Sequence, residues 1–534
     1  MPVITLYYDD LEELSGIDKD TVIKRIPMMG CDIERIEDDH VDIEFFPNRP
    51  DMYSTEGVAR ALRGFLDIET GSRDFKVTTS GVNVMKDKEI MNIRPQIACA
   101  VVRGMNFNSR SIESLMALQE SLHWAVGRNR RKVSIGVHDL GKIKPPFKYI
   151  AQDPNFKFIP LDLKEPLSMR DILEKHPKGI KFAFILEKFD KFPLIMDANG
   201  NVLSFPPIIN GEISRVTEET KDLFIEITGL DRSAVSIALN IVVASLAERG
   251  GKIESVVINE KEKTPHLEPK MMRITKRDVE ELIGLKLTED RIISCLHMMR
   301  YGASVSGDYI EVAVPAYRSD ILHNCDLLED IAIAYGFDEI KPELPGTSTA
   351  GKTHPASKLR DSINEIMVGL GYFEVMPFTL TNEVVQFDLM RREKADGITH
   401  ILYPISEDHT IVRPNILPNL LEILSINKHR ELPQRIFEVG EVVHFCRTNQ
   451  HLGALTIHPQ ANFTEIQAVV NAIMRERRIE YEVAASQDPA FIEGRRADII
   501  INGERKGVFG EIHPEVISNF WLEHPIIGFE LKLN

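Results

Sequence analysis

An acidic stretch near residue 320 holds the residues of this 534-residue chain that are best suited to metal chemistry. Residues 317–337 read YRSDILHNCDLLEDIAIAYGF, and four acids fall within eleven residues: Asp320, Asp326, Glu329 and Asp330. Carboxylate oxygens are hard ligands that suit a hydrated magnesium ion. The chemistry that this stretch offers is therefore Mg²⁺ binding.

The spacing of the acids also predicts the element that positions them. Asp326, Glu329 and Asp330 share one face of a helix, where like charges destabilise by a few tenths of a kcal/mol per pair, and Gly336 is a natural helix end. In one interpretation Asp326 is the N-cap, Glu329 is its capping-box partner, and the acids meet the positive end of the helix dipole. Capping does not require Asp320, whereas a metal site would use it. Spacing alone leaves both interpretations open.

Composition indicates a chain of several domains that stays in the cytoplasm. A length of 534 residues suggests roughly three to five domains. No run approaches the roughly 18 apolar residues of a membrane span, and the first residues, MPVITLYYDDLEEL, do not resemble a signal peptide, so we expect no membrane contact. Five scattered cysteines without a C-x-x-C pair argue against a disulfide framework and a zinc site.

The charge balance restricts contacts with nucleic acid to local patches. The chain has 64 basic and 81 acidic residues, a net charge of -17, so a polyanion is repelled overall. The compact basic cluster GRNRRK, residues 127–132, follows a helical pattern and precedes a strand-like one. Either it is a solvated turn between the two elements, or it contacts a phosphate backbone.

Loop-like segments divide the chain. Residues 259–270 and 341–358 are rich in proline, charged or small residues, and they isolate the short module between them. A softer boundary lies near residues 80–90. Short β-branched runs alternate with amphipathic helical patterns, which indicates α+β domains. The dinucleotide, zinc-protease and serine-nucleophile motifs are absent from the sequence.

Five longer motifs together resemble the β subunit of phenylalanyl-tRNA synthetase in its shorter archaeal and eukaryotic cytosolic form. They are FPNRPDMYSTEGVARAL (46–62), VSIGVHDL (133–140), VLSFPPIINGEISRVTEETKDLFIEITG (202–229), the acidic stretch, and IVRPNILPNLLEIL followed by RIFEVGEVVHF. The resemblance covers essentially the whole chain. It implies a subunit of an α2β2 heterotetramer that attaches phenylalanine to tRNA(Phe), with Mg²⁺ and with ATP bound mainly by the α subunit.

The resemblance also implies a domain plan. We expect an N-terminal B1-like domain at residues 1–85, a B3/B4 editing domain at 86–262, a B5 domain at 268–342, and a class II synthetase-like antiparallel-sheet domain at 350–534. Class II catalysis needs an R-x-E motif and a glycine-rich motif ending in arginine, because developing phosphate charge must be stabilised. Here Arg435 and Glu438 are three apart, so we expect this domain to be catalytically silent and the aminoacylation site to lie in α.

The same resemblance implies a site that hydrolyses mischarged Tyr-tRNA(Phe). Glu226 suits acceptance of a phenolic proton, and Thr228 follows on the same face of a predicted strand. The residues expected at this editing pocket are Glu226, Thr228, Ser204, Asn210 and His138. On residue types alone they could equally be an ordinary strand alternation, turn residues around FPPIING, and a histidine that braces a strand end.

Further expectations follow from the family. It places a magnesium ion at the boundary between the α and β subunits, and its acidic pattern is met here by Asp320, Asp326, Glu329 and Asp330 as the expected ligands. The NRPD segment, residues 48–51, reads either as a helix start with Pro50 near the first turn or as a partner contact through Arg49. Two other functions stay open from sequence: a free-standing deacylase of misacylated tRNA, and a non-enzymatic assembly or nucleic-acid-binding protein.

Overall fold

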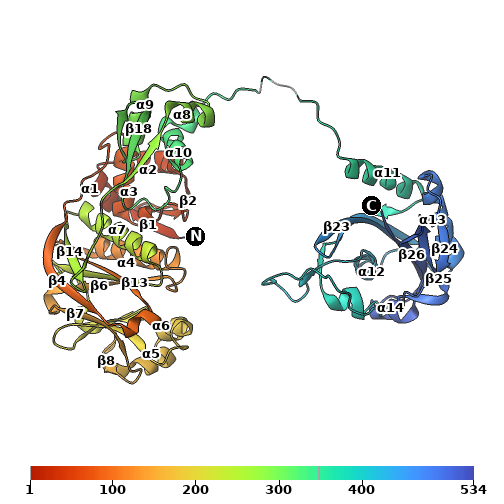
Figure 1. The fold of residues 1–534 in the computed structure, drawn as a ribbon, viewed down its shortest axis with the longest axis horizontal. Coiled ribbons are helices and arrows are strands. Elements are labelled where there is room, and N and C mark those ends of the chain that lie inside the picture. Colours follow the sequence, from red (N-terminus) through yellow and green to blue (C-terminus); the bar gives the residue numbers. More distant parts are fainter. Residues whose placement is uncertain (1, 345, 347–348, 534) are drawn as a thin grey trace. The chain divides into compact units, whose positions relative to one another are not determined.

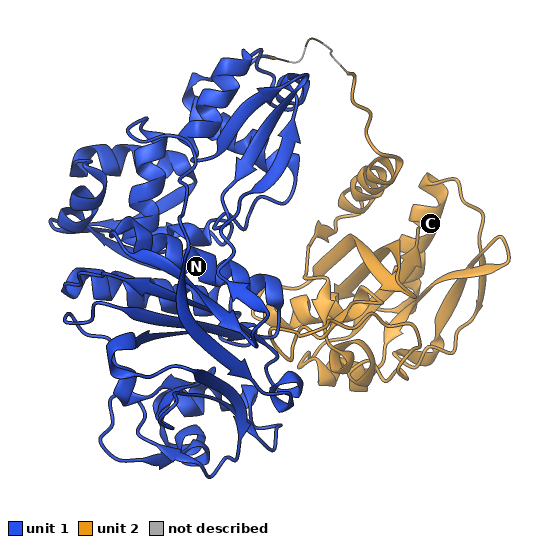
Figure 2. Ribbon diagram, turned by 60° about the vertical axis from the view of Figure 1, so that its left-hand side comes forward, with its two compact units in different colours: residues 1–343 blue, residues 344–534 orange. Residues whose placement is uncertain are grey.

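The chain forms two compact units, Met1–Glu343 and Leu344–Asn534 (Figure 2). A computed structural model describes residues 2–344, 346 and 349–533. Both units combine helices with mainly antiparallel sheets, so the predicted multidomain mixture of helix and sheet is confirmed. No helix among the described residues is long and apolar enough to cross a membrane.

The N-terminal part of the first unit is a three-stranded antiparallel sheet of order β1–β3–β2 with three helices. Its elements are β1 (Val3–Tyr7), β2 (Cys31–Ile36), β3 (His40–Phe45), α1 (Tyr8–Ser15), α2 (Lys19–Arg25) and α3 (Thr55–Phe65) (Figure 1). The NRPD segment does not begin α3, because Pro50 starts a separate 3-10 turn and Ser54 caps the helix. Arg49 and Asp51 instead form two hydrogen bonds of 2.9 and 3.0 Å.

A ten-stranded sheet forms the largest part of the first unit. Its path is β12–β11–β10–β7–β4–β14–β5–β13–β6, with β15 beside β14. The strands are β4 (Thr78–Lys86), β5 (Gln96–Arg103), β6 (Val133–Asp139), β7 (Phe147–Gln152), β10 (Phe192–Met196), β11 (Val202–Phe205), β12 (Ile209–Asn210), β13 (Leu223–Gly229), β14 (Lys252–Ile258) and β15 (Glu262–Thr264). Strand β13 pairs with β5 on one side and β6 on the other, and all of its residues are buried because apolar clusters pack on both of its faces.

Helices and a small hairpin complete this part of the unit. Helix α7 packs on β5 and β13, and α4 packs on β6. An apolar cluster joins the small hairpin and two short helices to β10 and β11. The elements are α4 (Ser109–Trp124), α5 (Met169–Lys175), α6 (Pro177–Phe182), α7 (Arg232–Glu248), β8 (Lys157–Phe158) and β9 (Leu167–Ser168).

The end of the first unit is a three-stranded antiparallel sheet of order β16–β18–β17 with three helices. The elements are β16 (Lys270–Ile274), β17 (Gly302–Ser306), β18 (Tyr309–Val314), α8 (Lys276–Ile283), α9 (Glu289–Met298) and α10 (Asn324–Tyr335). Helix α10 ends at Gly336, where the sequence predicts its end. The acidic stretch therefore lies in the loop before α10 and along its first turns.

The second unit is built on a seven-stranded sheet of order β19–β22–β23–β27–β26–β25–β24. Its strands are β19 (Phe373–Glu374), β22 (Gln434–His444), β23 (Arg447–Ile457), β24 (Glu482–Ala485), β25 (Phe491–Ile501), β26 (Glu504–Ile512) and β27 (Ile526–Lys532), with a hairpin of β20 (Leu380–Thr381) and β21 (Ile411–Val412). Neighbouring Ile436 and Phe437 belong to different apolar clusters, as strand alternation requires.

Helices cover both faces of this sheet. One cluster contains residues of α11 (Pro355–Gly369) and α13 (Phe463–Glu476), and the other contains residues of α12 (Leu417–Ile426) and α14 (Pro514–Asn519). A sheet buried on both faces by helices gives the second unit its own double core.

Candidate functional site

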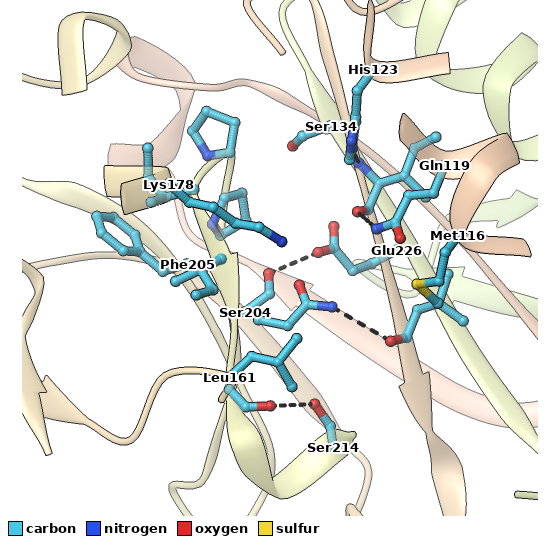
Figure 3. A pocket seen from close by; sticks show the side chains of 18 of the residues that line it. Met116, Gln119, His123, Ser134, Leu161, Lys178, Ser204, Phe205, Ser214 and Glu226 are labelled. Atoms are coloured by element: carbon cyan, nitrogen blue, oxygen red, sulfur yellow. Dashed lines mark hydrogen bonds between the residues drawn. The ribbon is translucent and has the colours of Figure 1, made fainter. Parts of the chain in front are cut away.

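A cavity of about 320 Å³ lies beside the middle of β13 in the first unit (Figure 3). Residues of β6, β11 and β13, of α4 and of the segment after β11 form its walls. Three of the residues predicted for the editing pocket, Glu226, Ser204 and Asn210, line it. The other two, His138 and Thr228, are buried beside the wall and are not lining residues.

Glu226 is a buried carboxylate with only part of its hydrogen-bonding capacity used. Its side chain is 2% exposed, and its Oε1 atom accepts a hydrogen bond of 2.7 Å from the Ser204 hydroxyl (Figure 3). Its Oε2 atom has no hydrogen-bond partner among the described residues. Gly136 on the paired strand makes room for it, because a Cβ there would lie 2.3 Å from Oε1. The wall of the cavity thus contains a carboxylate with one buried oxygen that accepts no hydrogen bond from the described residues.

His138 is placed behind this carboxylate by the register of β6 and β13. Its Nδ1 atom is 2.8 Å from the Ser214 hydroxyl, and its Nε2 atom is 3.9 Å from Glu226 Oε1, beyond hydrogen-bond distance. Ser214 lines the cavity, and no sequence pattern had marked it. His138 therefore supports two lining residues and does not enter the cavity itself.

Thr228 accepts hydrogen bonds from a buried arginine that the sequence analysis did not predict. Arg94 is 1% exposed and donates hydrogen bonds to the Thr228 hydroxyl (3.0 Å) and to its carbonyl oxygen (2.9 Å). The Thr228 hydroxyl is also 2.9 Å from the hydroxyl of Ser134, which lines the cavity. Burial lowers the pKa of the Arg94 guanidinium to about 10. Thr228 thus joins the cavity wall to a buried cation.

His123 of α4 brings a neutral imidazole to the cavity. Its Nε2 atom accepts a hydrogen bond of 2.8 Å from the backbone N–H of Ile135, so the neutral ring carries its proton on Nδ1. Burial lowers the pKa of His123 to about 4. The Nδ1 atom lies 3.6 Å from Glu120 and has no hydrogen-bond partner among the described residues. His123 therefore brings a neutral ring to the cavity wall, with the Glu120 carboxylate beside its buried Nδ1 atom.

Asn210 and Arg130 close two further parts of the wall. The Asn210 amide donates a 3.5 Å hydrogen bond to the Val137 carbonyl, and β12 pairs Asn210 with Ser204. Arg130, from the GRNRRK cluster, is buried and donates to the Ile208 carbonyl (2.9 Å) and to Glu120 (2.6 Å). Part of the basic cluster is thus built into the cavity and is not a solvated turn.

The four acids of the acidic stretch have separate partners in this chain, and their binding of Mg²⁺ stays a prediction. No group of three or more acidic, histidine or cysteine side chains within the described residues is placed to hold a metal ion. Arg318 is the reason, because its guanidinium donates to Asp320 (2.7 Å) and to Asp330 (2.6 Å). Although burial opposes the charge on Arg318, Asp330, Tyr301 and Asp320 raise its pKa well above the ordinary value. A cation of the chain itself holds two of the four predicted ligands.

The other two acids also have separate positions. The N-cap of α10 is His323 and not Asp326. Asp326 stands at the third helical position, and its carboxylate accepts from the backbone N–H groups of Leu322 and His323, both at 2.7 Å. Glu329 is exposed and takes no part in the capping box. The predicted N-cap role of Asp326 and the capping-box role of Glu329 are therefore wrong, although Asp326 does accept backbone hydrogen bonds at the start of α10.

In the second unit the acid of the RIFEVG segment is neutralised. Glu438 is buried, and both of its carboxylate oxygens accept hydrogen bonds from Arg413. Arg435 lies 3.4 Å from Glu465 instead of next to Glu438. The two residues that most resemble an R-x-E pair thus have different partners and do not form one site.

Three family profiles match the chain. The phenylalanyl tRNA synthetase beta chain CLM domain matches residues 340–533, the tRNA synthetase B5 domain matches 272–337, and the B3/4 domain matches 87–258. The cavity lies in the segment that the B3/4 profile matches, and the acidic stretch lies in the B5 segment.

Curated relatives match over the full length. The chain is 60% identical to the phenylalanine–tRNA ligase beta subunit of Methanosarcina acetivorans, over all of this chain and 99% of the relative. It is 59% identical to that of Methanococcoides burtonii, over the whole of both chains. Among solved structures, an N-terminal fragment of the phenylalanyl-tRNA synthetase beta subunit from Pyrococcus horikoshii has 38% identity and a TM-score of 0.61, covering 62% of this chain and 99% of the fragment.

Proposed function

The chain belongs to the family of phenylalanine–tRNA ligase beta subunits, and we propose that its cavity around Glu226 hydrolyses tyrosine wrongly attached to tRNA(Phe). As a beta subunit it serves in phenylalanyl-tRNA synthesis, which implies an α partner and tRNA. The proposal concerns the proofreading step, which adds to that shared role.

The free Oε2 atom of Glu226 is the observation that carries this proposal. A phenylalanine site cannot exclude tyrosine completely, and a second site can recognise the hydroxyl that the first one tolerates. The phenol O–H of tyrosine would donate to Oε2, whereas phenylalanine would leave this buried acceptor without a partner. A cavity of about 320 Å³ is of a size that suits an aromatic side chain.

The reaction at this site would be ester hydrolysis. Water attacks the ester carbonyl carbon, the bond to the ribose oxygen breaks, and a proton goes to that oxygen, which releases tyrosine and intact tRNA. The residues that hold the wall in place are Thr228, Arg94, His138 and Ser214.

Aminoacylation is assigned to the α subunit. In the described part of the second unit Glu438 is neutralised by Arg413, and Arg435 is directed to another acid, which supports a silent synthetase-like domain. ATP and the Mg²⁺ that tRNA ligases generally use would therefore bind mainly in α, within an α2β2 assembly in the cytoplasm.

A magnesium site on the acidic stretch does not fit this chain by itself. Arg318 already neutralises Asp320 and Asp330, and Asp326 accepts two backbone hydrogen bonds. Mg²⁺ demands near-ideal octahedral oxygen geometry, and the described side chains do not gather three such ligands. No step of the proposed reaction depends on this stretch.

The test is the variant Glu226→Ala in the α–β complex. Loss of the acceptor should slow hydrolysis of tyrosyl-tRNA(Phe) by about 5- to 150-fold, the equivalent of about 1–3 kcal/mol for a buried hydrogen-bond partner. Phenylalanine charging on the same preparation should stay within about twofold, since its site lies elsewhere. Ser204→Ala is the matched control for a change in the cavity wall. It keeps the Glu226 carboxylate and removes the Ser204 hydroxyl that donates a hydrogen bond to it. Equal losses of charging and hydrolysis, or unchanged hydrolysis, would contradict the proposal.

A further inference from the structure

The turn after α4 has a strained backbone that divides its arginines between the cavity and the surface. Arg128, Asn129 and Arg130 follow one another in the left-handed region, with φ of 47°, 54° and 63°. Three such non-glycine residues in sequence are costly and persist only where surrounding contacts enforce them. Gly127 is one of these constraints, because a Cβ there would lie 2.5 Å from the His123 carbonyl oxygen.

Arg94 supplies the second constraint and couples the turn to the cavity. Its guanidinium donates to the carbonyl oxygens of Arg130 and Arg131, both at 3.3 Å, while it also holds Thr228. One buried side chain therefore fixes both the wall of the cavity and the shape of the turn.

This shape turns Arg130 inward and leaves its neighbours outside. Arg130 is 6% exposed and lines the cavity, whereas Arg128 and Arg131 are exposed. The guanidinium of Arg131 lies over the Phe184 ring, 4.8 Å from its centre. Within the described residues neither Arg128 nor Arg131 forms a salt bridge, while nearby Lys132 has Asp231 at 3.4 Å. Two uncompensated charges thus stand beside the cavity of an acidic chain.

Aromatic rings and a further cation adjoin these arginines. Trp124 is 46% exposed, and its carbonyl accepts the N–H of Asn129 in the turn. Phe184 is 41% exposed, and Lys178 of α6 is both exposed and a lining residue of the cavity (Figure 3). We call Trp124, Arg128, Arg131, Lys178 and Phe184 the rim.

We infer that the rim binds the single-stranded 3′ end of the tRNA and directs its terminal ester to the cavity. The inference rests on the proposed function. Uncompensated cations suit phosphates, and exposed aromatic rings stack with unpaired bases of any sequence. The two together are typical of surfaces that bind single-stranded nucleic acid, and a net charge of -17 makes a basic rim at this place a local exception.

The first test removes the two free charges with Arg128→Ala and Arg131→Ala in the α–β complex. KM for tyrosyl-tRNA(Phe) should rise at least about fivefold with kcat nearly kept, and the slope of log KM against log salt should fall by about 1.4, or 0.7 for each lost phosphate contact. Hydrolysis of tyrosyl-adenosine, which has no polynucleotide, should not change. The matched control Lys276→Ala with Arg277→Ala removes two basic residues of the α8 region and should leave KM and the slope as they are.

The outcomes separate the rim from the cavity. Glu226→Ala should slow both esters, whereas the rim variant should affect only the tRNA ester. If the rim variant changes the hydrolysis of both esters equally, or of neither, the inferred role of the rim is wrong. If the Glu226 variant has no effect on hydrolysis, the proposed function is wrong. Trp124→Ala should raise KM about 5- to 100-fold if a base stacks there.

A second measurement does not depend on hydrolysis. Uncharged tRNA(Phe) with a photoreactive 8-azidoadenosine at its 3′ end is crosslinked to the complex, and the modified peptides are mapped. We expect crosslinks in residues 124–131 or 178–184. Crosslinks on the β chain that lie only outside these segments would contradict the inference.

Discussion

Two groups of buried acids in the first unit differ in how they are paired. Asp330, 5% exposed, accepts hydrogen bonds from Arg318 and Tyr301, and Asp320 shares the same guanidinium. Glu226, 2% exposed, has a hydroxyl on one oxygen and no partner on the other. Both acids of the first group are held by Arg318, whereas one carboxylate oxygen of Glu226 has no hydrogen-bond partner among the described residues.

The difference shows which buried polar groups are available for function. A buried charge that is fully paired is costly to break and offers nothing to a substrate. A buried acceptor without a partner is unfavourable in the free protein and is satisfied only when a donor arrives. Glu438 with Arg413, in the second unit, belongs to the first kind, because both of its carboxylate oxygens accept hydrogen bonds from one guanidinium.

The largest effect should come from removing the shared cation of the acidic stretch. Arg318→Met leaves Asp320 and Asp330 without their partner, and breaking a buried pair from one side typically destabilises by about 3–5 kcal/mol. We expect a clear drop in the urea midpoint of the first unit. Adding Asp320→Asn and Asp330→Asn to Arg318→Met should recover most of the loss. A loss below about 1 kcal/mol would show that the acids have other partners, and would reopen the predicted metal site.

A smaller effect should appear with pH at His123. Its pKa is about 4 in the folded chain and about 6.5 when unfolded, so the unfolded state binds the proton first as the pH falls. Stability is therefore complete above pH 6.5 and falls by up to about 3 kcal/mol as the pH drops to 4. His123→Gln keeps an acceptor for Ile135 and should reduce this loss.

The fluorescence of neighbouring Trp124 can follow this unfolding. The chain has two tryptophans, so a Trp521→Phe background makes Trp124 the sole reporter. Urea midpoints at pH 7 and pH 4.5 are compared for the parent and His123→Gln. If both lose the same stability, the neutral imidazole and its tautomer are not as described.

The smallest effect belongs to Asp326. Asp326→Asn keeps an oxygen for the backbone N–H groups of Leu322 and His323 but loses its charge, so it should cost about 0.5–1 kcal/mol. The magnesium dependence of α–β assembly should stay the same, also when Glu329→Gln is added. Assembly is titrated against magnesium for each variant, and a shifted dependence would restore metal binding by the acidic stretch.

Sequence reasoning reached what local patterns determine. The LFIEITG alternation put Glu226 and Thr228 on one face of a strand, and β13 has this geometry, because strand periodicity is local. The spacing of the four acids could not show that Arg318, twelve residues before Asp330, turns back to bind it. Arg94 and His123 were missed for the same reason, since their partners Thr228 and Ile135 lie on other elements. Such pairs exist only after folding.

The central claim is that the free oxygen of Glu226 distinguishes tyrosine from phenylalanine. The direct measurement is the ratio of the hydrolysis rates of tyrosyl-tRNA(Phe) and phenylalanyl-tRNA(Phe), for the parent complex and for Glu226→Leu, which keeps approximate volume without an acceptor. We expect a strong preference for tyrosyl-tRNA in the parent and a fall of at least about tenfold in this ratio in the variant, through slower hydrolysis of the tyrosyl ester. An unchanged ratio, or equal slowing of both esters, would contradict the claim.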